Sequence, residues 1–408
     1  MPSSTFSSET AGSETVGAEP AGSVGIATDR FERAGFVRQT ASDRPGVAQP
    51  VPERDVPVQP WGRIFLGAMF GAALLLGGWE LYWREWDATP GYRNSVGAWA
   101  EQRARINAGE GDATVLVGTS RLLFDVQLPE WERLSGARPI QLALEGTSPL
   151  PVLEDLAADP DFTGRAVVDV TPDLFFSGYA LRGEAVKHYH DRGPSQRSGH
   201  WLSKHLLETR LAFYDPDFAL PTVVRRQVWP LRPGMRPRTH VRKLMVLGPD
   251  RNTHMWPRVE FDPAYRRLAQ DIWAEDFGGP LPGMDTAAKK GAAIDAQVVR
   301  TLKAVERLRA RGVQVVFVRP PSGGRYYDYE QQHLPRAQTW DVLLARTGLP
   351  GVHFEDHPDL QGLDLPEWSH LSAADARRYT ARLQPLVERA FRQQETASNA
   401  ERVAVAAP

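Results

Sequence analysis

Charged residues are absent from one long stretch near the amino terminus of the chain. No charge occurs from Ile64 to Trp79, and if Glu80 is allowed the apolar stretch extends to Trp83. About 20 helical residues rise about 30 Å, which is the thickness of the hydrocarbon layer of a bilayer. Aromatic residues typical of membrane interfaces stand at both ends of the stretch, namely Trp61, Trp79, Tyr82 and Trp83. The pattern predicts one uncleaved transmembrane helix over residues 61–84.

Two other interpretations of this stretch stay open, a buried core helix and the apolar part of a cleaved signal. The charge-free part is short enough for a core helix. A cleaved signal fits less well, because the stretch begins after residue 60 rather than near the first residues. The flanking arginines are balanced and give no orientation, with Arg44, Arg54 and Arg63 before the stretch and Arg84, Arg93 and Arg103 after it.

Short apolar runs alternate with helical patterns beyond the stretch. The runs are Thr114–Val117, Ile140–Leu144, Ala166–Val170, Val313–Val318 and the shorter Val352–Phe354. They are rich in β-branched residues, as expected of strands that are buried on both faces of a parallel sheet. Apolar residues recur at helical spacing from Ile294 to Val305, and a further helix is expected to begin at Ser372. We predict an α/β domain with a doubly wound, mainly parallel five-stranded sheet of the flavodoxin-like type.

The composition divides the chain into segments. Residues 1–60 are mostly small, polar or charged and predict a disordered tail, and residues 392–408 predict a second one. A helical linker is expected over residues 85–111, followed by the α/β domain over residues 112–391. Residues 175–290 are too many for an ordinary connection between a strand and a helix, so we expect them to form a cap over the strand ends.

Composition and charge exclude several classes of protein. The absence of cysteine excludes disulfide scaffolds, thiolate zinc sites, iron–sulfur clusters and cysteine nucleophiles. The 48 basic and 50 acidic residues nearly cancel, so no general attraction to nucleic acid is expected. One basic run lacks acidic residues and is interpreted as a solvated face, with binding of an anionic polysaccharide or phospholipid head groups as the alternatives. It contains Arg225, Arg226, Arg232, Arg236, Arg238, Arg242 and Lys243.

Neither a metal nor a cofactor is predicted. Histidine and aspartate gather in two polar segments, one with His188, His190 and Asp191 and the other with His353, Asp356, His357 and Asp359. Such residues are common in polar loops by chance, so we expect no metal ligation there. No glycine-rich phosphate-binding motif follows a predicted strand.

Polar residues that suit a serine hydrolase follow the predicted strands. Ligands bind at the carboxyl ends of the strands in such sheets, where the candidates are Ser120, Gly146, Thr171 and Asp173, joined by Glu367 and His370 before the last helix. A serine hydroxyl needs a base to take its proton, and the base needs a third group to fix its tautomer. Taken alone, Ser120 could also be a helix cap, Gly146 a turn residue and His370 an ordinary loop histidine.

The arrangement resembles the SGNH (GDSL-like) hydrolase superfamily over residues 112–391. The resemblance is carried by Gly118-Thr119-Ser120, by Gly146 and by Glu367-Trp368-Ser369-His370. It implies that Ser120 is the nucleophile, His370 the general base and Glu367 its orienting acid. It also implies that the backbone amides of Ser120 and Gly146 form an oxyanion hole.

The sequence departs from the family pattern at two places. The asparagine that the family places after the third strand is absent from Val170–Leu174, so Thr171 or a residue of the insertion would have to replace it. Loss of one oxyanion donor costs about 100-fold to 1000-fold in rate. The acid is Glu367 rather than the usual aspartate, and Asp364 is a nearby alternative.

Two classes of function follow from the resemblance. The first is a membrane-anchored serine esterase or O-acyltransferase that acts on acyl esters, such as acetyl esters, of a cell-envelope carbohydrate. The second is a weakly active or inactive subunit of a polysaccharide system, and in both a membrane acyltransferase or polysaccharide machinery is the expected partner. Similar anchored proteins imply the bacterial inner membrane with the carboxyl-terminal domain in the periplasm. Arg121 and Asp173 are possible substrate contacts, although a solvated Arg121 is the simpler interpretation.

Overall fold

The computed structural model describes residues 58–227 and 243–406. The chain divides into two units, residues 1–70 and residues 71–408. Helix α2 (Trp61–Glu85) is long and apolar enough to cross a membrane. Its most apolar window has none of its surface buried, which argues against a core helix. The tail predicted over residues 1–60 falls almost wholly outside the described residues.

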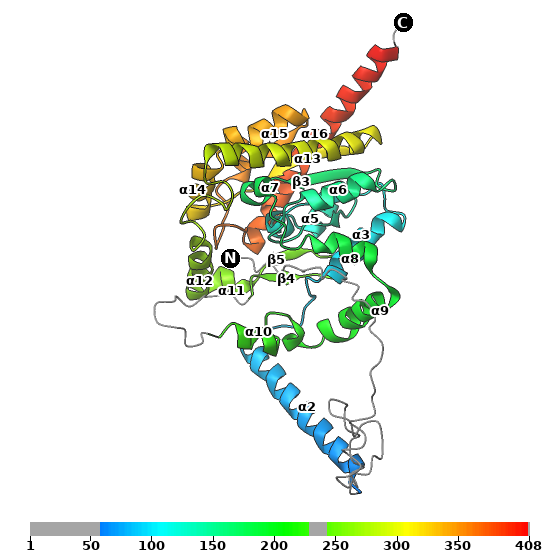
Figure 1. Cartoon of the computed structure of the whole chain (residues 1–408), viewed down its shortest axis with the longest axis vertical. Coiled ribbons are helices and arrows are strands. Elements are labelled where there is room, and N and C mark those ends of the chain that lie inside the picture. Colours follow the sequence, from blue (N-terminus) through cyan, green and yellow to red (C-terminus); the bar gives the residue numbers. More distant parts are fainter. Residues whose placement is uncertain (1–57, 228–242, 407–408) are drawn as a thin grey trace, which may run out of the picture. The chain divides into compact units, whose positions relative to one another are not determined.

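The second unit is built on a five-stranded parallel sheet (Figure 1). The strands are β1 (Thr114–Val117), β2 (Ile140–Gln141), β3 (Arg165–Asp169), β6 (Gln314–Arg319) and β7 (Gly351–His353). Their order across the sheet is β2-β1-β3-β6-β7 and every pair is parallel. All five predicted runs are confirmed as strands. β2 is shorter than its run, but Leu144 still donates its N–H to the Gly118 carbonyl at 2.8 Å, so the two chains stay paired beyond the strand.

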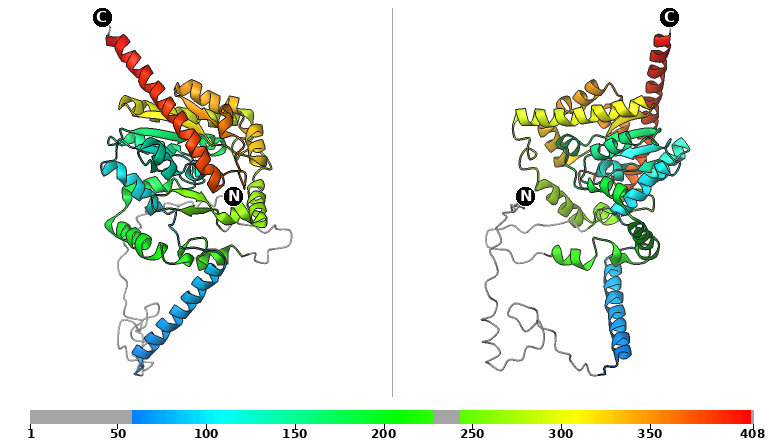
Figure 2. Two further views of the ribbon diagram at one scale, coloured as in Figure 1. Left: turned by 180° about the vertical axis from the view of Figure 1, so that it is seen from behind. Right: turned by 45° about the vertical axis from the view of Figure 1, so that its right-hand side comes forward.

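Helices cover both faces of the sheet, because successive strand residues point to opposite sides. Val115 and Val117 belong to one core cluster and Leu116 to the other. The first face is covered by α3 (Val96–Asn107), α6 (Leu150–Ala158), α7 (Pro172–Ser177), α8 (Glu184–Asp191), α13 (Ala287–Ala310) and α15 (Trp340–Thr347). The second face is covered by α4 (Ser120–Asp125), α5 (Leu128–Ser135) and α16 (Ala373–Ala406), and α16 lies in front of the sheet in the rear view of Figure 2.

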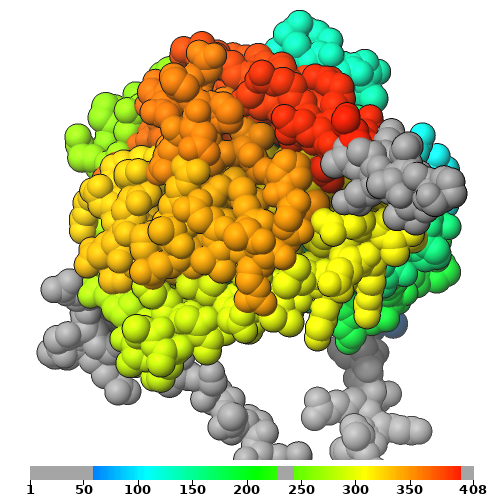
Figure 3. Space-filling model, turned by 90° about the horizontal axis from the view of Figure 1, so that it is seen from above, coloured from blue at the N-terminus to red at the C-terminus, as the bar shows by residue number. Residues whose placement is uncertain are grey.

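The segment between β3 and β6 contains the predicted insertion. After α7 and α8 come α9 (Pro194–Leu202), a π-helical turn (Ser203–Glu208), a 3₁₀ turn (Ala212–Tyr214) and α10 (Leu220–Arg225). The antiparallel strands β4 (Met245–Leu247) and β5 (Thr253–Met255) follow, then α11 (Pro257–Phe261) and α12 (Pro263–Ala274). Beyond β6 lie α14 (Gly324–His333) and 3₁₀ turns at Arg336–Gln338, Phe354–Asp356 and Pro358–Leu360. Seen from above, the yellow to red segments form one continuous surface (Figure 3).

The basic run is only partly described, since residues 228–242 lie outside the described residues. Within the described part, Lys243 is buried and its Nζ lies 2.5 Å from Asp215 Oδ2. Arg226 pairs with Asp217 at 2.8 Å. The solvated-face interpretation is therefore wrong for Lys243, which is buried and paired with Asp215. Asp215 and Asp217 precede the run in sequence, and each pairs with a basic residue near one of its ends.

The carboxyl-terminal tail predicted over residues 392–408 is also corrected. α16 continues to Ala406 instead of ending near residue 391. Contacts with the sheet support the extension: Arg165 at the start of β3 pairs with Glu395, and Gln394 donates to the Val315 carbonyl at 2.9 Å. The predicted linker over residues 85–111 contains α3, while residues 88–95 before it are not helical.

Candidate active site

A tight turn after β1 positions Ser120 at the start of α4. Thr119 caps the helix, and both its backbone N–H and its hydroxyl donate to Asp169 Oδ2, at 2.9 and 2.6 Å. Gly118 is required here, since a Cβ at this position would lie 2.6 Å from Asp169 Cβ. The turn is thus held by Asp169, the last residue of β3. Ser120 itself is partly exposed.

Thr171 takes part in the same buried network. Its hydroxyl donates to Asp169 Oδ1 at 2.9 Å and lies 2.9 Å from the hydroxyl of Thr119. Burial raises the pKa of Asp169, although the hydrogen bonds from Thr119 and Thr171 oppose this shift. Because the Thr171 hydroxyl is bonded within the network, it is committed to positioning the Ser120 turn in this structure.

Glu367 and His370 form a buried pair on the loop before α16. His370 Nδ1 lies 2.6 Å from Glu367 Oε1, which also accepts the backbone N–H of His370 at 2.8 Å. The indole N–H of Trp273 on α12 donates to the other oxygen, Oε2, at 2.5 Å. Asp364 is exposed, and the bonds seen at this residue come from its backbone. The structure thus places Glu367, rather than Asp364, against the imidazole.

The loop between the two partners contains an unusual backbone conformation. Trp368 has a φ of 73°, in the left-handed region that glycine normally occupies. Its carbonyl accepts the N–H of Gly323 at 2.8 Å. A Cβ on Gly324 would lie 2.6 Å from the indole ring of Trp368, so this glycine leaves the space that the ring fills.

Helix α4 connects Ser120 to the histidine loop. The Arg121 Nε donates to Ser369 Oγ at 3.3 Å, the Phe124 ring stacks on the His370 ring at 4.2 Å, and Leu371 N–H donates to Asp125 Oδ1 at 2.9 Å. Ser120 lies one helical turn before Phe124 on the same side of α4. The structure therefore places Ser120 on the same side of α4 as the Phe124 ring that stacks on His370.

The last link of the expected triad is not formed. His370 Nε2 is buried and has no hydrogen-bond partner among the described residues. A hydrogen bond from Ser120 Oγ is thus absent in this structure. Catalytic hydrogen bonds are often long in the absence of substrate.

Arg121 is buried, and the expectation that it is solvated is wrong. Its side chain is 1% exposed and lies 2.7 Å from Glu330 Oε1 on α14. Burial by itself would lower the pKa of Arg121, but the ion pair with Glu330 outweighs it and raises that pKa. Glu330 also pairs with Arg319 at 2.6 Å. Arg121 is therefore held by protein groups rather than left free for a surface ligand.

Asp173 has one buried, unpaired oxygen beside this cluster. Tyr326 Oη donates to its Oδ2 at 2.6 Å, whereas its Oδ1 is buried without a hydrogen-bond partner among the described residues. Burial raises the pKa of Asp173, and the nearby Arg121 opposes that shift. Arg121 also lies 4.7 Å from the ring centre of Tyr326. An unpaired buried carboxyl oxygen of this kind can accept a hydrogen bond from a ligand.

Gly146 lies on the loop after β2, two residues beyond the Leu144 that pairs with Gly118. It has a φ of 58°. A Cβ there would lie 3.2 Å from Leu181 Cδ2, so the exposed Leu181 side chain covers this turn. The pairing of Leu144 places the Gly146 loop next to the Ser120 turn at the same edge of the sheet.

Several residues of the site were missed by the sequence reasoning. Trp273 and Glu330 contact Glu367 and Arg121 from helices that carry no motif. Asp169 did carry a signal, because this carboxylate directly follows the apolar residues 166–168 at the end of a buried strand. Such a residue must be bonded when it is buried.

Two of the histidines considered for metal binding, His353 and His190, contact protein groups. His353 Nδ1 accepts the Glu355 N–H at 3.2 Å, and His190 Nε2 lies 2.6 Å from Asp155 Oδ1. Burial lowers the pKa of His353 to about 3, with a further contribution from Arg319. His353 is therefore held neutral by its surroundings near neutral pH.

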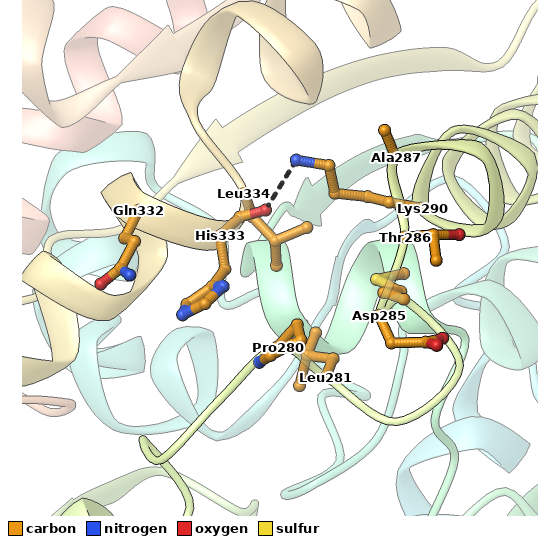
Figure 4. A pocket seen from close by; sticks show the side chains of 10 residues that line it. Pro280, Leu281, Asp285, Thr286, Ala287, Lys290, Gln332, His333 and Leu334 are labelled. Carbon is orange, nitrogen blue, oxygen red and sulfur yellow. Dashed lines mark hydrogen bonds between the residues drawn. The ribbon is translucent and has the colours of Figure 1, made fainter.

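One cavity, of about 250 Å³, lies beside the start of α13 (Figure 4). Lys290 Nζ donates there to the His333 carbonyl at 3.2 Å. Ser120, Glu367 and His370 do not line it, so it is separate from the candidate site.

The chain matches no protein-family model and no curated protein.

Proposed function

We propose that this protein is a membrane-anchored serine esterase or O-acyltransferase of the SGNH type. The observation that carries the proposal is the buried Glu367–His370 pair on a loop that packs against the helix beginning at Ser120. Because Glu367 occupies Nδ1, the other ring nitrogen, Nε2, is left to accept a proton. The strand order is that of flavodoxin-like doubly wound sheets, which supports the predicted type.

The geometry suggests a division of roles. Ser120 Oγ attacks the acyl carbonyl carbon while His370 Nε2 takes the hydroxyl proton. The carbonyl oxygen becomes an anion facing the backbone amides of Ser120 and Gly146. His370 then gives its proton to the departing alcohol, and an acyl group remains on Ser120. Water, or the hydroxyl of an acceptor, attacks that acyl group and regenerates the serine.

The proposed substrate is an acyl ester, such as an acetyl ester, of a cell-envelope carbohydrate. The unpaired Oδ1 of Asp173 can accept a hydrogen bond from a sugar hydroxyl, and Trp273 and Tyr326 provide aromatic surface near it, with ring centres 6.2 Å apart. Pockets for small molecules commonly combine apolar walls with a few such polar groups. The proposal includes the bacterial inner membrane, a periplasmic domain, and a membrane acyltransferase or polysaccharide machinery as partner.

One observation favours the alternative, a weakly active or inactive subunit of a polysaccharide system. The Thr171 hydroxyl, which was the candidate for the missing asparagine, is bonded to Asp169 and Thr119. In addition, His370 Nε2 is closed to solvent. An idle site of this kind would keep the fold and bind without turnover.

A fluorophosphonate probe separates the two functions. We expect the full chain in detergent to be labelled and Ser120→Ala to lose the label. Ser177→Ala is the matched control, since this serine on α7 bonds the Leu174 carbonyl and belongs to neither the pair nor the Ser120 turn. Labelling of this control should match the wild type. A wild-type chain that resists the probe across the pH range would support the alternative.

A further inference from the structure

The segment Pro194–Glu208, formed by α9 and the π-helical turn, turns polar side chains toward the domain and apolar side chains toward the outside. Lys204, His200 and Glu208 join it to the rest of the domain through hydrogen bonds and ion pairs. Lys204 Nζ and His200 Nε2 lie 2.7 and 3.1 Å from Glu101 Oε2 on α3. Glu208 accepts the N–H of Arg93 at 3.0 Å. A helix on the surface of a soluble protein normally turns its apolar side inward, so the usual order is inverted here.

The apolar side chains of this segment point away from the domain. Trp201, Leu202, Leu206 and Leu207 are 55%, 47%, 45% and 37% exposed, and we name these four residues the outer apolar surface. No residue of α9 is buried. Isolated short helices are marginal in water, and most of their stability in proteins comes from burial of an apolar face. The outer apolar surface therefore requires a covering that the described residues do not provide.

The segment lies beside the end of α2. Glu80 accepts the backbone N–H groups of Ala212 and Phe213 at 2.9 and 3.0 Å. Arg84 donates to the Arg210 carbonyl at 3.0 Å. The three partners, Arg210, Ala212 and Phe213, come directly after the segment Pro194–Glu208 in the chain. The part of α2 that they contact, within Gly71–Glu85, belongs to the same unit as this segment. Figure 1 shows α9 and α10 on the same side of the second unit, which includes residues 71–85 of α2.

The residues around the outer apolar surface have the composition of a membrane interface. Trp201 stacks on His205 at 4.8 Å. A cavity of about 230 Å³ beside it is lined by Arg192, Arg197 and Lys204 among others. Arg192 and Arg197 both line this cavity, and burial together with the charge of Arg197 lowers the pKa of Arg192. Amphipathic helices that lie in a bilayer surface combine tryptophan and leucine with basic residues that reach phosphate groups.

We propose that the outer apolar surface inserts into the head-group layer of the same bilayer that α2 spans. The covering is a lipid surface, because the end of the spanning helix is bonded to the chain that immediately follows the segment Pro194–Glu208. The domain then rests on the membrane through two contacts instead of one. This inference is independent of the proposed chemistry, since none of its residues contacts Ser120, Glu367 or His370 in the structure.

The absence of cysteine allows a direct test with single labels. Leu206→Cys carries an environment-sensitive NBD group on the surface, and Leu134→Cys on α5 is a matched exposed leucine outside it. Leu75→Cys on α2 reports the anchor itself. The full chain is reconstituted in vesicles of phosphatidylglycerol and phosphatidylcholine, with and without doxyl-labelled phosphatidylcholine. We expect blue-shifted emission and strong lipid quenching at positions 206 and 75, and neither effect at position 134.

Three results would overturn the proposal. Equal quenching by aqueous iodide at positions 206 and 134 would mean that the surface stays in water. Protection at position 206 that appears only at high protein density, without lipid quenching, would assign the covering to a second copy of the chain. A label at position 75 that lipid does not quench would remove the anchor and the proposal with it. Fluorophosphonate labelling of Ser120, if present in the wild type, should be the same in all three variants, which keeps this test separate from the proposed activity.

Discussion

At the residue scale, the position of Glu367 decides how the imidazole is held. Three donors converge on its carboxylate: His370 Nδ1, the His370 backbone N–H and the Trp273 indole. An ionised carboxylate accepts all three, whereas an amide can accept at only one of its two end atoms. The pair thus fixes both the direction and the tautomer of His370.

We predict that Glu367→Gln lowers kcat/KM for a short-chain aryl ester by about 10³-fold to 10⁴-fold, because the amide favours the wrong tautomer. Asp364→Asn is the control and should stay close to the wild type, since Asp364 is exposed and makes no contact with the ring among the described residues. The assay is steady-state hydrolysis by the full chain in detergent. Similar losses in both variants would mean that the acid has been assigned wrongly.

The sequence predicted the identity of the pair but not its surroundings. Glu367 and His370 could be recognised because they are three residues apart, so one loop contains the whole interaction. Arg121 was misjudged because its partner Glu330 is more than 200 positions away in the chain. Charge alone suggests the surface, and only the fold shows that a buried carboxylate meets it.

At the element scale, α4 is the part that links the two halves of the site. It begins at Ser120 and ends at Asp125, whose carboxylate binds the residue after His370. Burial raises the pKa of Asp125 well above its usual value. A displacement of this short helix would therefore move the serine relative to the imidazole.

We predict that Gly118→Ala destabilises the domain by about 1–3 kcal/mol, the usual range for overpacking. The added Cβ would lie 2.6 Å from Asp169 Cβ and 2.8 Å from Leu122 Cβ, so α4 has to shift. Gly291→Ala on α13 is the matched control, because a Cβ there meets no atom within 4 Å. Urea unfolding in detergent, followed by tryptophan fluorescence, measures both. Equal stability of the two variants would show that the turn tolerates a side chain.

Local sequence patterns predicted which helices and strands form more accurately than they predicted where these elements end. The β-branched runs identified every strand of the main sheet, since burial on both faces leaves a continuous apolar signature. The end of α16 was misplaced because residues 392–402, directly after Phe391, are mostly polar. Their helix is supported by Glu395 and Gln394, which reach Arg165 and the Val315 carbonyl. Polar contacts of that kind leave no periodic pattern.

At the scale of the whole molecule, α2 is joined to the folded domain rather than loosely attached to it. Trp83 is fully buried and stacks on Phe218 with ring centres 4.8 Å apart. Phe218 belongs to the insertion, which also supplies Trp273 to Glu367. The insertion thus contacts both the end of the anchor and the candidate site. Neither contact could be predicted, because both pair residues that are distant in the chain and lack a motif.

We predict that Trp83→Ala lowers the free energy of unfolding by about 3–5 kcal/mol, the usual cost of truncating a buried aromatic side chain. Leu75→Ala, on the same helix but 78% exposed, should change it by less than about 0.5 kcal/mol. Chemical unfolding of the full chain in detergent provides the comparison. If both variants were equally stable, α2 would be a tether that the domain does not need.

The left-handed conformation of Trp368 has a consequence for how this chain can change. Holding a large residue there costs about 1–3 kcal/mol, a penalty that glycine would not incur. The indole nevertheless fills the space above Gly324, and so it braces the loop that presents His370. Selection for heat resistance alone would favour glycine at position 368, which removes this strain. The variants obtained would unfold at higher temperature, but His370 would be held less firmly in its catalytic orientation.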